Sequence, residues 1–231
     1  MKEKKEFIYT GQSNLEAMTE AVNYNKFLIS LVIDQMNNKE DRILDFGAGS
    51  GTYSCLLKKM NITSDCLEPD STLRNILDSL GFKVFEDLEE IKPESYDLIF
   101  SLNVFEHIED DLSQIKVLKS KLKEGGRLLI YVPAYQVLFS NMDKKVGHYR
   151  RYRIRDLRKL AESSGFKIRM VRYYDPAGFA AALFYRISGG NGNLSAKSIS
   201  MYDKIIFPFS KKLHSITNKF IGKNAILVVE K

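Results

Sequence analysis

Cysteine is scarce in this sequence, which has only Cys55 and Cys66 among its 231 residues. Two cysteines are too few for a disulfide framework, and these two lack the spacing of metal ligands. We therefore expect both to be reduced side chains of the core. The sequence predicts neither a structural disulfide nor a bound metal ion.

Long apolar runs are also absent. No stretch of 18 or more apolar residues occurs, so no membrane-spanning helix is predicted. The first six residues are mostly charged, and the apolar segment of a secretory signal does not follow them. These absences predict a cytoplasmic protein. The length and the 44% share of hydrophobic residues fit one α/β domain with a full core.

Charge is distributed unevenly along the chain, although the net charge is only +6. Residues 1–143 contain 16 basic and 24 acidic side chains, whereas residues 144–231 contain 19 and 5. A basic segment can attract an anionic partner such as a phosphate, a membrane surface or a nucleic acid. The alternative is a solvated helix face. We recognise no separate RNA-binding module and expect no DNA partner, but an RNA substrate stays open.

The most informative segment is 43–54, ILDFGAGSGTYS, where a hydrophobic strand runs into three glycines, Gly47, Gly49 and Gly51. Such glycines let backbone amides approach a ligand, and the helix that follows directs its positive end there. A dinucleotide fingerprint requires glycine at the position of Thr52, which disfavours an NAD-linked oxidoreductase. With Asp45 before the glycines, the segment resembles motif I of the class I S-adenosylmethionine (SAM) dependent methyltransferases.

Further segments follow in the order expected of that family. Residues 65–70, DCLEPD, place an acidic residue, Glu68, at the end of the next predicted strand. Residues 96–108, YDLIFSLNVFEHI, resemble the family's motif IV pattern "YDLI…NVLEHI", and 126–133, GRLLIYVP, resemble its fifth strand. The resemblance implies an α/β, Rossmann-like, seven-stranded mixed sheet of order 3-2-1-4-5-7-6. Helices cover both faces of that sheet, and its seventh strand is antiparallel.

The resemblance also implies the cofactor, S-adenosyl-L-methionine, and the residues that bind it. These are Asp45, Gly47, Ala48, Gly49, Gly51, Glu68, Pro69, Asp87, Leu88, Ser101 and Asn103. We expect Glu68 to accept hydrogen bonds from the ribose hydroxyls, and Asp45 to hold the loop or the methionine amino group. Asp87, Leu88 and Pro69 are expected around the adenine. Ser101 and Asn103 are expected near the transferred methyl group.

Methyl transfer from SAM is an in-line displacement, and a base is needed only when the acceptor is protonated at neutral pH. The candidate catalytic residues are His107, His148 and Tyr152. Residues 142–152, MDKKVGHYRRY, resemble a "D…GHxRRY" signature of a branch associated with glycosyltransferases or lipid-modifying enzymes. Tyr24, Arg150 and Arg151 are candidate substrate contacts. Both arginines could clamp an anion, or could pair with core acids to fasten the loop.

We therefore predict methyl transfer to a small-molecule or lipid-linked acceptor, at oxygen. The oxygen preference rests on the histidine and tyrosine candidates and on the lack of an Asn/Asp-Pro-Pro-Tyr motif after the fourth strand. The alternatives are an RNA- or protein-directed methyltransferase and a SAM-binding protein without turnover.

The alternation of strands and helices predicts one methyltransferase domain over 1–231. Its expected parts are an N-terminal helical cap (1–40), a SAM-binding core (41–174), a helical insertion or lid (175–222) and a terminal strand (223–231). An amphipathic stretch with interleaved lysines, 198–221, is interrupted by Pro208; it favours a lid or dimer surface over the second interpretation, peripheral membrane attachment. The oligomeric state stays open.

Overall fold

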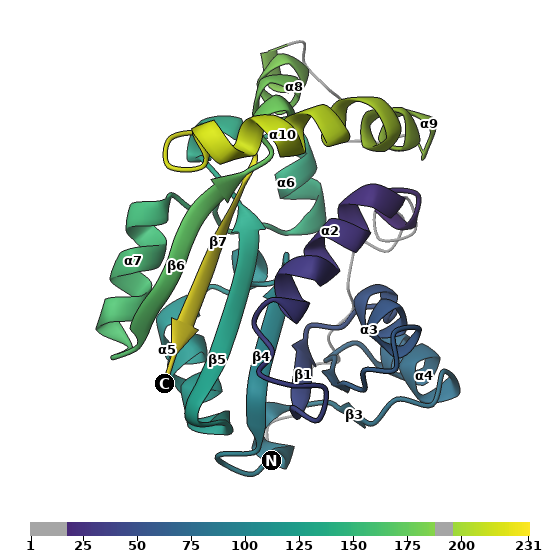
Figure 1. Ribbon diagram of the computed structural model, residues 1–231, viewed down its shortest axis with the longest axis vertical. Helices are drawn as coiled ribbons and strands as arrows, with labels where there is room; N and C mark the ends of the chain where they lie inside the picture. The colour runs from purple at the N-terminus through teal and green to yellow at the C-terminus, as the bar shows by residue number, and fades with distance from the viewer. Residues whose placement is uncertain (1–17, 188–195) are drawn as a thin grey trace.

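The computed structural model describes residues 18–187 and 196–231 (Figure 1). These residues form one seven-stranded sheet of order β3-β2-β1-β4-β5-β7-β6. Its strands are β1 (Ile43–Phe46), β2 (Asp65–Leu67), β3 (Val84–Phe85), β4 (Tyr96–Leu102), β5 (Leu122–Pro133), β6 (Lys167–Tyr174) and β7 (Asn224–Glu230). The first five strands are parallel, and β7 is antiparallel to both β5 and β6. The predicted fold class and strand order are confirmed.

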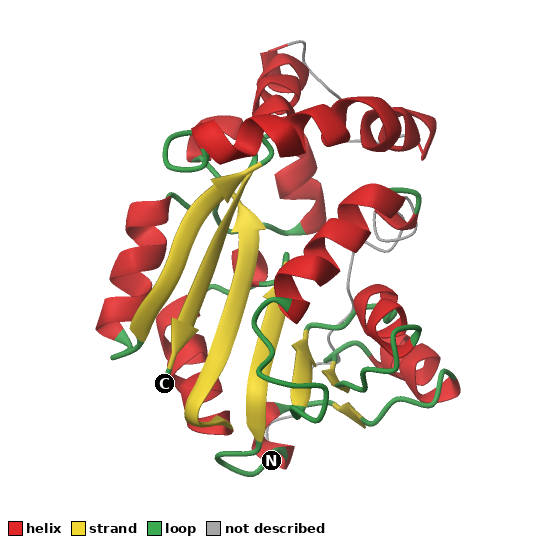
Figure 2. Cartoon of the chain, viewed as in Figure 1, coloured by secondary structure: helices red, strands yellow, loops and turns green. Residues whose placement is uncertain are grey.

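Helices lie on both faces of the sheet, as Figure 2 shows. They are α2 (Val22–Ile33), α3 (Thr52–Lys58), α4 (Ser71–Ser79), α5 (Asp111–Lys121), α6 (Asn141–Val146), α7 (Ile154–Ser163), α8 (Pro176–Ile187), α9 (Ala196–Met201) and α10 (Phe207–Thr217). Short 3-10 turns occur at Leu88–Glu90, Phe105–His107 and Gln136–Leu138. Of the predicted N-terminal cap, α2 is seen, and residues 1–17 lie outside the described part.

The central strands are buried on both faces, because alternate side chains of a strand point to opposite sides of the sheet. Ile99 of β4 belongs to the core cluster that includes Ile115 of α5 and Leu157 of α7. Its neighbours Leu98 and Phe100 belong to the opposite cluster, which includes residues of α2 and of the insertion. This two-sided burial explains why β4 reads as a nearly continuous apolar run.

The insertion before β7 is helical, and it lies at the end of the sheet where β4, β5 and β6 finish (Figure 1). The predicted interruption at Pro208 takes the form of a π-helical segment, Tyr202–Ile206, between α9 and α10. Proline has no backbone N–H and cannot donate within a helix, so a local change of helical geometry accommodates it.

Candidate active site

The glycine loop after β1 is built for close backbone contact. Gly47, Gly49 and Gly51 all have positive φ, at 79°, 57° and 83°. A Cβ on Gly47 would lie 2.5 Å from the Cγ2 of Val104, and one on Gly51 would lie 2.8 Å from Leu77. Side chains are therefore excluded by backbone conformation and by space. The loop presents main-chain groups at the carboxyl ends of β1 and β4, where open α/β sheets bind ligands.

Glu68 is attached to this loop from the end of β2. Its Oε2 accepts the N–H of Gly49 at 2.8 Å, and its Oε1 accepts the N–H of Asp70 at 3.0 Å. Burial raises the pKa of the Glu68 carboxyl, and these two backbone donors oppose the rise. Each carboxylate oxygen has a second lone pair, so Glu68 can still accept hydrogen bonds from a bound ribose. The expected ribose role stays a prediction.

Asp45 faces the protein interior and is 1% exposed. Its Oδ2 accepts the hydroxyl of Ser54 at 2.8 Å, and the hydroxyl of Ser64 donates to that of Ser54 at 2.8 Å. Burial raises the pKa of Asp45 to about 7, although the bond from Ser54 lowers it. Of the two roles that the sequence left open, this geometry supports the first, in which Asp45 fastens α3 behind the glycine loop.

The residues expected around the adenine are held mainly by local structure. Asp87 caps the 3-10 turn at Leu88–Glu90 and accepts the N–H of Glu89 at 3.0 Å. Leu88 is 7% exposed and belongs to the core cluster on the α5 side of the sheet. Pro69 is exposed, and its carbonyl accepts a hydrogen bond from Arg74. No contact here assigns an adenine-binding role, which stays a prediction for all three.

The end of β4 carries the two residues expected near the methyl group. Ser101 is fully buried, and its hydroxyl has no hydrogen-bond partner among the described residues. Asn103 follows in the left-handed region, with φ 57°, and ends the strand. Buried hydroxyls are normally paired, so Ser101 has bonding capacity left for a bound group. Together with the glycine loop and Glu68, it fits a nucleoside-containing cofactor with a polar tail.

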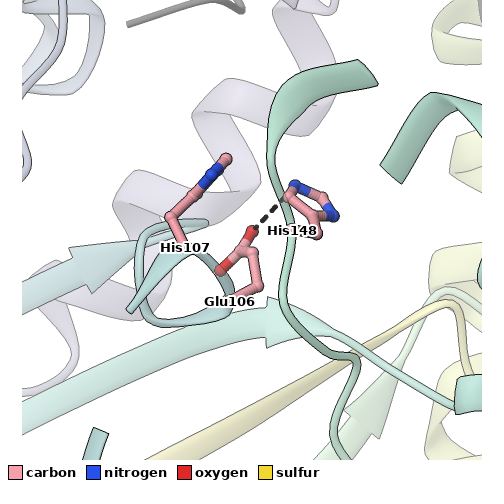
Figure 3. Close-up of side chains that lie close together, drawn as sticks. All are labelled: Glu106, His107 and His148. Atoms are coloured by element: carbon pink, nitrogen blue, oxygen red, sulfur yellow. Dashed lines mark ion pairs between the residues drawn. The ribbon is translucent and has the colours of Figure 1, made fainter. Parts of the chain in front are cut away.

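Three side chains gather where β4 ends, in a cluster drawn in Figure 3. Glu106 and His107 belong to the 3-10 turn after β4, and His148 follows α6. The Nε2 of His148 lies 3.9 Å from the Oε1 of Glu106, and the two imidazole centroids are 4.6 Å apart. Burial raises the pKa of Glu106 to about 8. Burial and the neighbouring His148 lower the pKa of His107 to about 4.

Asp143 holds His148 in place from the first turn of α6. Its Oδ1 lies 2.7 Å from the Nδ1 of His148 and accepts the Nε–H of Arg151 at 2.8 Å. Its Oδ2 accepts the backbone N–H of Ser140 at 2.8 Å. Burial alone would raise the pKa of Asp143, but His148 and Arg151 hold it well below its usual range. Because an ionised carboxylate can only accept, the Nδ1 of His148 carries the proton.

Neither Glu106 nor Asp143 was among the residues predicted for the site. The signals that could have identified them were the Glu-His pair after the fourth strand and the aspartate five positions before His148. Both are visible in the sequence, but only the fold brings them together.

The structure gives two predicted site residues internal partners. Tyr152 was a catalytic candidate, but its buried hydroxyl donates to Asp111 at 2.8 Å, and its pKa is raised far above the ordinary value by burial. Tyr24 was a substrate candidate, but it is 9% exposed and packs in the core, with its hydroxyl 3.3 Å from that of Tyr131. These contacts support structural roles for both tyrosines, because their hydroxyls are hydrogen-bonded inside the protein.

Arg150 and Arg151 could clamp an anion or fasten the loop, and in the structure each of them pairs with an aspartate. Arg151 holds Asp143 with two nitrogens, at 2.8 and 3.0 Å. Arg150 lies 3.0 Å from Asp111 and donates to the carbonyl of Glu109. This geometry supports the fastening role. A hollow of about 420 Å³ is bordered by both arginines and by Lys159, but neither the glycine loop nor a histidine lines it.

Comparisons with known proteins identify the family of the chain. Residues 20–171 match the family model described as a methyltransferase domain. A 96-residue stretch is 35% identical to a malonyl-[acyl-carrier protein] O-methyltransferase of Ilyobacter polytropus, and covers 38% of this chain and 37% of that protein. A 99-residue stretch is 31% identical to a ubiquinone biosynthesis O-methyltransferase of Xanthomonas campestris, and covers 38% and 41%. These matches span about two fifths of each relative's length.

Among solved structures, a SAM-dependent methyltransferase from Thermotoga maritima has the same fold, with a TM-score of 0.65 at 15% identity. That likeness covers 96% of this chain and 98% of the other. The glycine loop, Glu68 and Ser101 would hold the SAM cofactor, which supplies a methyl group on a positively charged sulfur. Because the family model matches well over half of the sequence, this chain belongs to the methyltransferase-domain family of SAM-dependent enzymes.

Proposed function

We propose that the protein transfers a methyl group from SAM to a hydroxyl oxygen of a small-molecule or lipid-linked acceptor. The observation that carries this proposal is the 2.7 Å contact between Asp143 and His148, beside Glu106 and His107. A hydroxyl must lose its proton as it is methylated, so a base at the acceptor position is the group that an O-methyltransferase needs. The rest of the rate enhancement comes from alignment and exclusion of water.

His148 has the arrangement of an oriented base. Its Nδ1–H donates to Asp143, so the lone pair of Nε2 lies on the opposite side of the ring. Asp143 fixes this tautomer and would stabilise the imidazolium that forms when Nε2 accepts the hydroxyl proton. Arg151 in turn holds both carboxylate oxygens of Asp143. Asp143 is therefore held by Arg151 while it orients His148.

The names of two curated relatives support transfer of the methyl group to an oxygen atom. Both are O-methyltransferases by name, one acting on a malonyl group carried by a protein and one in ubiquinone biosynthesis. The names of these two relatives support oxygen as the methylated atom.

The test is release of S-adenosylhomocysteine from SAM with a panel of phenols and carrier-linked carboxylic acids. We expect turnover with at least one hydroxyl acceptor, and a large loss of turnover in His148→Ala. His214→Ala is the matched control, because His214 lies in α10 and stacks on Tyr174 away from the cluster. Near-normal turnover in His148→Ala would remove the base role. SAM binding without turnover on any acceptor would favour the non-catalytic alternative.

A second observation favours contact with a membrane surface, which suits a lipid-linked acceptor. The outer side of the insertion exposes large apolar side chains, namely Phe184, Ile187, Met201, Ile205, Phe209, Ile216 and Phe220. Exposed lysines, including Lys204 and Lys219, accompany them. No helix within the described residues is long and apolar enough to cross a bilayer. An apolar face with cationic neighbours is the pattern of a helix that lies in the interface.

Sedimentation with vesicles tests this contact. We expect binding to vesicles that contain anionic lipid, weaker binding at high salt, and loss of binding in Phe209→Ser/Ile216→Ser. A protein that stays in the supernatant with anionic vesicles at low salt would refute membrane contact and favour a lid or dimer surface.

A further inference from the structure

We propose that Glu106, His107 and His148 bind one divalent transition-metal ion at the acceptor side of the active site. Each side chain offers one ligand atom, and these atoms lie within 4.8 Å of one another. The side chains come from two segments, the turn after β4 and the residue that follows α6, and converge as Figure 3 shows. The sequence predicted no metal site because 40 residues separate the two histidines.

The spacing suits a common ion. Imidazole and carboxylate ligands bind Zn²⁺ at about 2.0–2.2 Å, so two ligands of one tetrahedral ion lie about 3.4 Å apart. The Nε2 of His148 and the Oε1 of Glu106 are already 3.9 Å apart. No separation in the cluster is more than 4.8 Å, so side-chain movements of about 1 Å would bring the three ligand atoms to the tetrahedral spacing.

Glu106 gives independent support. The residue is 1% exposed, and its Oε2 is buried without a hydrogen-bond partner in the described structure. Among the described residues, the only ion-pair partner of Glu106 is His148, whose Nε2 lies 3.9 Å from the Oε1 of Glu106. A buried oxygen without a partner is costly, and buried carboxyl groups are normally hydrogen-bonded, paired or bound to a metal ion. A metal ion in the cluster would supply the missing partner.

The surroundings of both histidines are those of metal ligands. The Nδ1 of His148 donates to Asp143, which leaves Nε2 directed toward Glu106. Metal-binding histidines almost always donate their other ring N–H to a carboxylate or a backbone carbonyl in this way. The ring of His107 hydrogen-bonds to the backbone of Val146 and Gly147, next to His148. Both rings are therefore oriented before any ion binds.

Two imidazoles and one carboxylate select ions such as Zn²⁺, Fe²⁺, Co²⁺ and Mn²⁺, and three protein ligands leave positions open. A cation there would bind the acceptor oxygen and favour its deprotonated form. In that case His148 acts as a ligand instead of a base. This consequence for catalysis rests on the proposed function, whereas metal binding does not.

The experiment is a titration of the purified, chelator-treated protein with Co²⁺, followed by the visible absorption of the bound ion. We expect one Co²⁺ per chain in the native protein, displaced by Zn²⁺. Glu106→Gln and His148→Gln should weaken binding at least about tenfold, and Asp143→Asn by about 10–100-fold. The control His214→Gln should bind as the native protein does. Circular dichroism and binding of S-adenosylhomocysteine check that each variant is folded.

Native protein without visible Co²⁺ absorption, or Glu106→Gln with unchanged affinity, would overturn the metal site. The two proposals fail differently. Metal binding without methylation of any hydroxyl acceptor would refute the proposed function alone. Hydroxyl methylation by protein that binds no Co²⁺ would refute the metal site alone and leave His148 as the base.

Discussion

The carboxylate of Asp203 accepts the backbone N–H of Tyr24 at 2.8 Å, across 179 residues of sequence. Its other oxygen accepts the N–H of Asn23 at 2.9 Å. The residue at the N-cap position of α2, Ala21, makes no side-chain cap. Asp203 belongs to the π-helical segment of the insertion, so the insertion caps the helix that covers the front of the sheet. The two parts of the molecule are thus stabilised together.

Asp203→Ala should therefore lower the free energy of unfolding by about 1–3 kcal/mol, because the buried N–H of Tyr24 and the part-buried N–H of Asn23 lose their acceptor. Urea unfolding followed by circular dichroism measures the change. Asp78→Ala is a matched control, since Asp78 is exposed near the end of α4. We expect it to stay within about 0.5 kcal/mol of the native protein. Equal stability of both variants would contradict the capping role.

Gly47→Ala should weaken S-adenosylhomocysteine binding by at least about tenfold and destabilise the fold by about 1–3 kcal/mol. The added Cβ meets Val104 at 2.5 Å on a backbone with φ 79°. Calorimetry and thermal unfolding check both effects. Gly125→Ala is the control, because Gly125 has φ 73° but no atom within 4 Å of the added Cβ. Gly125→Ala should lower the free energy of unfolding only because alanine disfavours a positive φ, and it should leave ligand binding unchanged. Unaltered binding in Gly47→Ala would refute the close-contact loop.

Asp45 should make the cofactor-free protein less stable as pH rises from about 4 to about 7. Burial raises its folded-state pKa to about 7, while the unfolded chain releases this proton near pH 3.9. Between these values the folded state keeps a proton that the unfolded state has lost. The free energy of unfolding therefore falls by up to about 1.4 kcal/mol per pH unit and levels off above the folded pKa.

Asp45→Asn removes this titration and keeps an acceptor for Ser54. Unfolding of both proteins across this pH range is the measurement, and the difference between them isolates Asp45 from other titrating groups. We expect the variant to gain relative stability as pH rises. Parallel curves for the two proteins would show that Asp45 is not protonated in the fold.

Much of the framework could be predicted from the sequence. Strand β4 (Tyr96–Leu102) lies within the segment 96–108 that resembles motif IV, because its apolar run is flanked by polar turns. The glycine loop was predicted because its conformation needs three glycines that a strand or a helix would not contain. Strand β5 is longer than predicted, because it begins directly at the end of α5. Pairing with β7, which is remote in sequence, supports most of its length.

The candidate site could be predicted only as separate residues. His107 and His148 were candidates, but their 4.6 Å ring contact depends on α6, which brings residue 148 back over the turn after β4. The direction that the chain takes through α6 cannot be predicted from residue types alone. Tyr24 and Tyr152 were assigned to the site because sequence shows residue type but not the direction of a side chain. In the fold, both hydroxyls find internal partners.

Arg151 and Arg150 should differ sharply in their contribution to stability. Arg151 is 9% exposed and its partner Asp143 is 1% exposed, whereas Arg150 is 34% exposed. Removal of one member of a buried pair leaves the other charge uncompensated, so Arg151→Gln should cost about 3–5 kcal/mol. Arg150→Gln should cost at most about 1 kcal/mol, because exposed pairs contribute little. If Arg151 instead clamps an anionic acceptor, urea unfolding of Arg151→Gln will match the native protein, and only the KM for the acceptor will rise.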